Sequence, residues 1–110
     1  MMKFDVAGME AHGYDQREKN VFYQTSEFKM RVIDLAPGQG IPRCDMMSYV
    51  VFVCVEGEAE VSVNLDKATI SRGQGLITEP AMISMQTNAG ARLLGIQIAP
   101  RSTEINQGNG

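Results

Sequence analysis

Several residue types on which protein sites often depend are scarce in this chain. Its 110 residues include no tryptophan, one histidine and two cysteines. A single histidine, His12, excludes any metal site built from several histidines. If Cys44 and Cys54 lie on one extended strand, they are roughly 33 Å apart, whereas a disulfide needs Cα atoms within about 7 Å. We therefore predict two free thiols, as is usual in a reducing compartment.

Clustered positive charge and long apolar runs are also missing. The net charge is −3 and the estimated pI is about 5.0, and no basic stripe interleaved with aromatics is present. Nucleic-acid surfaces need clustered cations, so we expect no nucleic-acid partner. The longest apolar run, Tyr49 to Val55, is too short to span a bilayer, and the first five residues lack a signal-like apolar stretch. We expect a cytoplasmic protein without a membrane partner.

The residues that are present predict β structure. Short runs of alternating or apolar residues recur about every ten residues and are separated by turn signals such as Pro37-Gly38 and Gly73-Gln74-Gly75. In residues 58–64, for example, Ala59 and Val61 alternate with polar neighbours. This spacing is typical of a sandwich or barrel. We predict an irregular segment over residues 1–19, one β domain over residues 20–98 and a flexible tail over residues 99–110.

The stretch from Gly38 to Gly57 resembles the first cupin motif, G-x5-H-x-H-x3-E-x6-G, with both glycines and the spacing kept. The second cupin motif is matched more loosely, with Pro80 at its proline and Met82 where a glycine is usual. Residues 53–61 look like the hairpin of that family. The resemblance covers about residues 20–98 and implies an all-β fold, the double-stranded β-helix or jelly-roll barrel.

The metal ligands of the cupin family are absent at the matching positions. Where metal-binding cupins have three histidines and a glutamate, this chain has Cys44, Met46, Val50 and Met85. The family's metal site therefore cannot be transferred to this chain, and we expect no metal or other cofactor. Whether the chain is an enzyme stays open, because no Ser/His/Asp arrangement, phosphate-binding loop or paired carboxylates are visible.

Strand alternation gives a view of the same region that does not depend on the family. If residues 44–55 form one strand, even-numbered residues share one face and odd-numbered residues share the other. Both faces are apolar, so this strand is predicted to lie in the middle of a two-layer structure or at a subunit contact. Cupins are often homodimers, and we expect a homodimer here.

Three hypotheses for function follow. The first is a metal-independent pocket for an unknown small, mostly apolar molecule, lined by Cys44, Met46, Phe52, Met82 and Met85. These residues are equally suited to filling a barrel core. The second is a soft-metal centre of the Cu(I) type at Cys44, Met46 and Met85, in an enzyme or a metal handler. The third is an accessory or sensor subunit.

Three polar residues in the β region are also candidates for a pocket. Arg31 and Arg92 are expected at the surface, where most arginines lie, although either would suit an acidic ligand at a pocket mouth. Gln97 shares parity with Leu93 and is a candidate buried polar group. Whether the N-terminal segment, with His12, folds across the barrel mouth is left open by the sequence.

Overall fold

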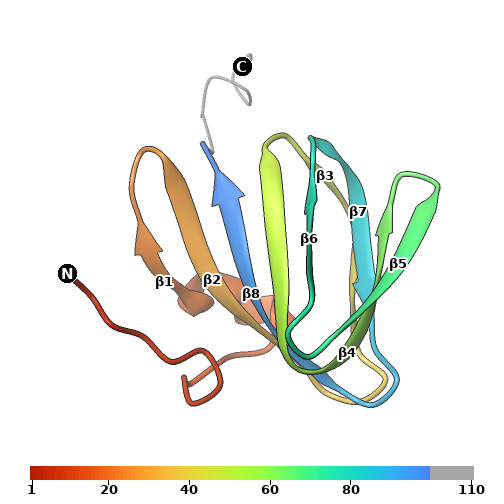
Figure 1. Ribbon diagram of the computed structural model, residues 1–110, viewed down its shortest axis with the longest axis horizontal. Coiled ribbons are helices and arrows are strands. Elements are labelled where there is room, and N and C mark those ends of the chain that lie inside the picture. Colours follow the sequence, from red (N-terminus) through yellow and green to blue (C-terminus); the bar gives the residue numbers. More distant parts are fainter. Residues whose placement is uncertain (100–110) are drawn as a thin grey trace.

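The computed structural model describes residues 1–99 and consists mainly of β strands (Figure 1). This confirms the prediction of an all-β chain. The predicted tail lies, from residue 100 onward, outside the described residues. In chain order the elements are the 3₁₀ helix η1 Tyr14–Asn20 and the strands β1 Val21–Gln24, β2 Phe28–Leu35, β3 Gly40–Met46, β4 Tyr49–Val63, β5 Asp66–Ser71, β6 Gly75–Thr78, β7 Ala81–Gln86 and β8 Ala91–Ile98.

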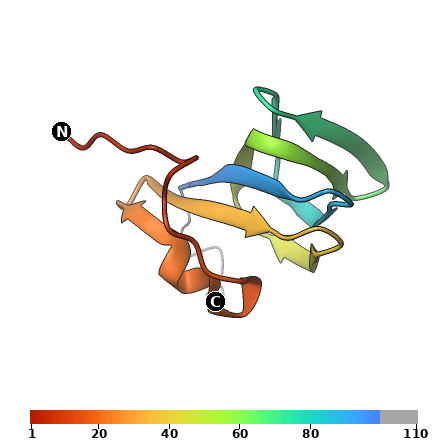
Figure 2. The same cartoon turned by 90° about the horizontal axis from the view of Figure 1, so that it is seen from below.

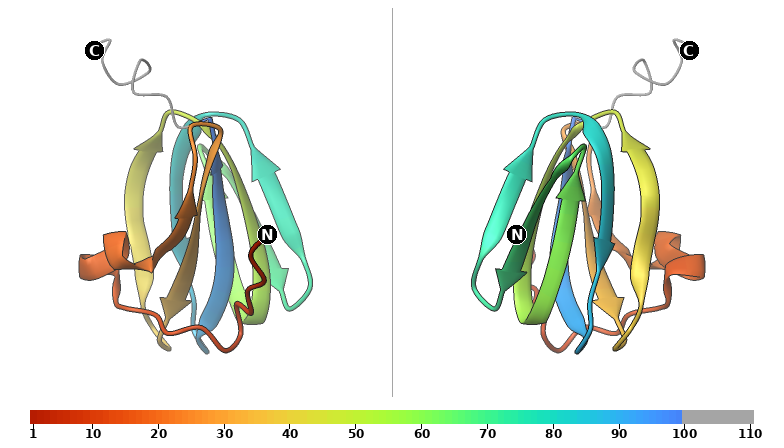
Figure 3. Two further views of the ribbon diagram at one scale, coloured as in Figure 1. Left: turned by 90° about the vertical axis from the view of Figure 1, so that its left-hand side faces the viewer. Right: turned by 90° about the vertical axis from the view of Figure 1, so that its right-hand side faces the viewer.

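The strands form two antiparallel sheets that share the long strand β4. The first sheet has the order β1-β2-β8-β4-β6, and the second has the order β3-β7-β4-β5. Residues 49–57 of β4 pair with β8, and residues 58–63 pair with β5. The sheet therefore curls around a common interior, and Figure 3 shows this interior between the curved layers.

The passage of β4 from one sheet to the other depends on Gly57. Its φ of 77° lies in the left-handed region, which glycine adopts without steric cost. A β-carbon at this position would lie 2.1 Å from the carbonyl oxygen of Gly90. The hairpin predicted over residues 53–61 is therefore wrong, because the chain bends there but stays in one strand. The hairpin turn comes later, at Asn64, whose φ is 54°.

The prediction of one strand over residues 44–55 is also wrong. Strand β3 ends at Met46 and belongs to the second sheet, whereas β4 begins at Tyr49 and opens in the first sheet. Met47 and Ser48 make the crossing between the sheets. The predicted alternation survives this break in part, because Met46, Val50 and Phe52 still turn toward the interior.

The core consists of the inward-facing residues of both sheets. The alternation predicted for Ala59 and Val61 is confirmed, since both are fully buried. Leu65 is 98% exposed, because it lies in the turn after β4. Within residues 1–99, no helix is long and apolar enough to cross a membrane. The buried core cluster is Ile33, Leu35, Val50, Phe52, Cys54, Ala59, Val61, Ile70, Ile83, Met85, Ala91 and Leu93.

Candidate functional site

A cavity of about 320 Å³ lies between the two sheets. It is large for a packing defect, because a water molecule occupies about 30 Å³ in the liquid and the space has room for about ten. Alternation along the strands points apolar side chains into it from both sheets. Its apolar wall includes Ile33, Leu35, Ile41, Met46, Val50, Phe52, Ile83 and Met85.

Gly95 in β8 creates part of this space. Strand register places it between Arg31 of β2 and Phe52 of β4. A β-carbon at Gly95 would lie 3.2 Å from Cδ1 of Ile33 and 3.7 Å from Cε1 of Phe52, so the missing side chain would point inward. Leu93, two residues earlier on the same face, is fully buried. The Leu93 side chain thus fills the interior at its position in β8, whereas the interior beside Gly95 is left without a side chain from β8.

The N-terminal segment reaches the mouth of the cavity, which answers the question left open for His12. His12, Tyr14, Arg17, Glu18 and Asn20 all line the cavity. The structure places η1 in the part of the chain that we expected to be irregular. In Figures 2 and 3, η1 lies on the side of β2 toward which β3 also lies.

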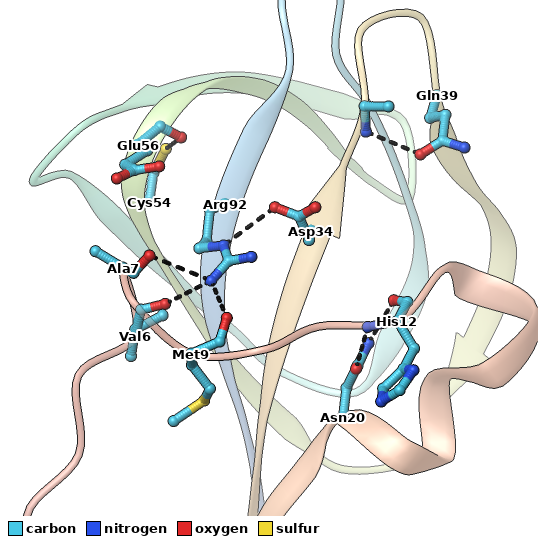
Figure 4. Close-up of polar contacts among 11 residues, drawn as sticks. Val6, Ala7, Met9, His12, Asn20, Asp34, Gln39, Cys54, Glu56 and Arg92 are labelled. Carbon is cyan, nitrogen blue, oxygen red and sulfur yellow. Dashed lines mark hydrogen bonds and ion pairs between the residues drawn. The ribbon is translucent and has the colours of Figure 1, made fainter.

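A pair of hydrogen bonds shapes the segment before η1. The backbone N–H of His12 donates to Oδ1 of Asn20 at 2.7 Å, and Nδ2 of Asn20 donates to the carbonyl oxygen of His12 at 2.9 Å (Figure 4). Asn20 is buried, so this two-way contact satisfies an amide that would otherwise lose its hydrogen bonds to water. The contact closes the loop between His12 and Asn20 and holds it at the cavity mouth.

Arg92 holds the start of the N-terminal segment against the first sheet. Its Nε contacts Oδ1 of Asp34 at 3.1 Å, and its Nη1 donates to the carbonyl oxygens of Val6 at 3.0 Å, Ala7 at 3.3 Å and Met9 (Figure 4). The Arg92 side chain is only 15% exposed. The surface position expected for Arg92 is therefore wrong, because this guanidinium is covered by backbone that it holds in place.

The structure brings four of the five predicted pocket residues to one cavity. Cys44, Met46, Phe52 and Met85 line it. Met82 does not: it is 39% exposed and faces away, because Ile83 and Met85 occupy the inward positions of β7. Met82 was selected from the loose second motif, whereas strand alternation would have excluded it.

The four positions that match the family's metal ligands also converge. Cys44, Met46, Val50 and Met85 all line the cavity. The thiol of Cys44 donates to Sδ of Met46 at 3.8 Å. Within residues 1–99 no group of three or more His, Cys, Asp or Glu residues is placed to hold a metal ion.

The two thiols differ sharply in environment. Both cysteines are free, as predicted, with Cys44 exposed and Cys54 fully buried. Burial raises the pKa of the Cys54 thiol, a backbone hydrogen bond at Glu56 opposes this rise, and the negative charge of Glu58 adds to it. Cys54 is therefore a core residue held as the neutral thiol, and Cys44 is the accessible one.

The sequence analysis named Arg31 and Gln97 only as pocket candidates, expected Arg31 at the surface, and missed Lys29. Lys29 and Arg31 in β2 and Gln97 in β8 line the cavity, and register places Lys29 opposite Gln97. Strand alternation could have indicated that Lys29 and Arg31 point inward, because they have the same parity in β2 as Ile33 and Leu35, which belong to the core. Arg31 is partly buried rather than fully exposed.

Comparison with known proteins gives structural matches only. No family model matches the chain, and no curated protein matches its sequence. The chain is similar to a Klebsiella pneumoniae protein with a double-stranded β-helix domain, at a TM-score of 0.77 and 16% identity, covering 92% of both chains. It is similar to an RmlC-like cupin from Desulfovibrio desulfuricans, at a TM-score of 0.74 and 18% identity, covering 92% of this chain and 100% of that one.

A third similar structure is a cupin superfamily protein from Desulfitobacterium hafniense, with a TM-score of 0.70 and 13% identity. The match covers 84% of this chain and 85% of that one. Identities this low are informative about the fold and not about activity. The double-stranded β-helix predicted from the motif spacing is confirmed.

Proposed function

Because the chain has the cupin fold, with a largely apolar cavity where that fold's metal ligands would stand, we propose that it binds a small organic molecule without a metal. The cavity carries this proposal. Its volume of about 320 Å³ falls at the lower end of the range for small-molecule sites, roughly 300–1,000 Å³. Its wall combines apolar side chains with a few polar groups at one side, which is typical of such sites.

Methionines suit the proposed pocket. Met46 and Met85 contribute flexible, polarisable side chains that adapt to different ligand shapes. A wall of this kind favours a molecule with an aliphatic or aromatic body over a sugar or a nucleotide, which would need many more polar partners. The space left at Gly95 distinguishes this arrangement from a filled core, where side chains pack at near-crystalline density.

Methyl resonances of isotope-labelled methionine test this proposal. Adding octanol or phenylpropanol is expected to shift the signals of Met46 and Met85, which line the cavity, and to leave those of Met47 and Met82 unchanged. The unshifted pair serves as an internal control, because both are exposed away from the cavity. Shifts confined to Met47 or Met82, or no shift at all, would contradict a binding cavity.

One observation favours a second candidate, a Cu(I) site. Two sulfur ligands bound to one metal at about 2.3 Å with a tetrahedral angle lie about 3.8 Å apart, and Sγ of Cys44 and Sδ of Met46 are 3.8 Å apart. Met85 would complete the sulfur set. The positive charge of Lys29 and Arg31 in the same cavity opposes a cation. This candidate requires one copper per chain by elemental analysis, and loss of that copper in Cys44→Ala.

We also propose that the outer face of the first sheet joins two copies of the chain. Register aligns Ile77 of β6, Val51 of β4 and Ile96 of β8 in one outward row, and Ile77 is 66% exposed. A two-fold contact pairs a patch with itself. An apolar patch is complementary to its own copy, whereas a patch of one charge repels it.

Light scattering of the eluting protein tests self-association. The wild-type chain is expected to have the mass of a dimer, and Ile77→Lys to shift it to the monomer, because a buried unpaired charge at a subunit contact is unfavourable. Leu65→Lys is the matched control, because Leu65 is exposed in the turn between β4 and β5. A monomeric wild-type protein, or equal effects of the two variants, would refute this contact.

A further inference from the structure

The mouth of the cavity carries positive charge that the protein does not neutralise. Lys29 and Arg31 enter the cavity wall from the inner face of β2, and both are partly buried. Within residues 1–99 neither side chain forms a hydrogen bond, an ion pair or a cation–π contact. Two partly buried cations without partners are unusual, because burial of a charge is costly unless the charge is paired.

The acidic residues of the cavity wall do not balance these cations. Asp34 pairs with Arg92 at 3.1 Å, on the outer side of the first sheet where the N-terminal segment lies (Figure 4). Glu18 is the remaining carboxylate of the wall. A third cation, Arg17, stands over the Tyr14 ring at 4.2 Å. Among the residues that line the cavity, Glu18 is therefore the one carboxylate outside an ion pair, against the three cations Arg17, Lys29 and Arg31.

The charged groups are concentrated on one side of the cavity. Lys29 pairs in register with Gln97, and Arg31 pairs with Gly95, so a guanidinium, an ammonium and an amide occupy neighbouring positions on β2 and β8. The glycine leaves the inner space beside Arg31 free of a side chain. Phe52 and Met85 belong to the apolar wall.

We propose that the ligand is an apolar monocarboxylate, whose carboxylate is bound by Arg31 and Lys29 and whose aliphatic or aromatic body lies against Phe52 and Met85. This inference rests on the proposed function. A guanidinium binds a carboxylate with two parallel hydrogen bonds, and the carboxylate would give both cations a partner. A phosphate dianion fits less well, because phosphate sites depend largely on free backbone N–H groups, whereas those of β2 and β8 pair within the sheet.

Matched pairs of probes test this inference separately from the proposed function. Octanoate is compared with octanol, and phenylpropanoate with phenylpropanol, by isothermal titration calorimetry. Each pair shares one apolar body and differs in the charged group. We expect the carboxylates to bind about ten- to a hundredfold more tightly than the alcohols, which corresponds to one charge-assisted contact.

Variants then assign the preference to residues. Arg31→Met is expected to abolish most of the difference between acid and alcohol while leaving alcohol affinity within about twofold, because the stem of the side chain is kept. Lys29→Met is a second variant with the same expected direction. Arg72→Met is the matched control. Arg72 is exposed in the turn between β5 and β6, so this substitution removes the same charge at a position outside the cavity wall.

The outcomes separate the two proposals. Equal binding of acids and alcohols would overturn the inference and leave the binding cavity standing. No binding of either class would overturn the proposed function and the inference with it. Equal losses of acid affinity in Arg31→Met and Arg72→Met would assign the preference to net charge rather than to this site, and would also overturn the inference.

Discussion

Replacement of Gly57 by alanine is expected to lower the free energy of unfolding by about 3–5 kcal/mol, the largest effect of any single methyl group added to this chain. Two penalties combine at this residue. Its φ of 77° lies where residues with a β-carbon are strained. The new β-carbon would also lie 2.1 Å from the carbonyl oxygen of Gly90. Neither atom is free to move, because both belong to backbone that joins β4 to β8.

Chemical denaturation measures this loss, and Gly73→Ala is its control. Gly73 has a similar φ of 85°, but a β-carbon added there would have no atom within 4 Å. We therefore expect Gly73→Ala to cost only the conformational penalty of about 1–2 kcal/mol. Similar losses in the two variants would show that the close approach of β4 to Gly90 is not needed for the fold.

Gly95→Leu is expected to weaken binding of octanol and octanoate about a hundredfold, which is about 2.8 kcal/mol. The leucine side chain would extend toward Ile33 and Phe52 and occupy space that the ligand needs. A ligand excluded from about 100 Å² of apolar wall loses about 2.5 kcal/mol. The chain is expected to stay folded, because the side chain enters existing space. Circular dichroism and calorimetry measure the two properties independently.

Gly95→Ala provides the graded comparison. Its single methyl group meets the flexible end of Ile33 at 3.2 Å, which is close but not backbone contact, so an intermediate loss of affinity is expected. Unchanged affinity in Gly95→Leu would place the ligand outside the cavity. Circular dichroism of the same samples distinguishes a loss of affinity caused by a filled cavity from one caused by unfolding of the Gly95→Leu variant.

The all-β fold could be predicted because apolar and polar residues alternate within short segments of the sequence, which indicates strands with one buried face. Ala59 and Val61 alternate with polar residues and are buried, as expected. The path of β4 could not be predicted in the same way, because a glycine that allows a turn also allows a bend within a strand. That the strand bends at Gly57 depends on the close contact between Gly57 and the backbone of Gly90, which lies far along the chain.

The site was predictable where alternation and the motif spacing coincide. Cys44 and Met46 satisfy both criteria, and both line the cavity. Phe52 was selected by alternation alone. Met85 came from the same looser motif as Met82, and of these two only Met85 lines the cavity. The N-terminal part of the site had no local signal. His12 is held at the cavity mouth by its backbone contacts with Asn20. The residues before it are held against the first sheet by Arg92 in β8, which binds the carbonyl oxygen of Val6.

The contact between Arg92 and the N-terminal segment sets the order in which the site can form. Nη1 of Arg92 binds the carbonyl oxygen of Val6 across 86 residues of chain, and β8 lies between β2 and β4 in the first sheet. On the ribosome, the segment that lines the cavity mouth emerges before the strand that holds it. Such distant pairing is slow, because loop closure precedes any stabilising contact. A nascent chain therefore acquires the complete wall of this cavity only once β8 has been synthesised and inserted.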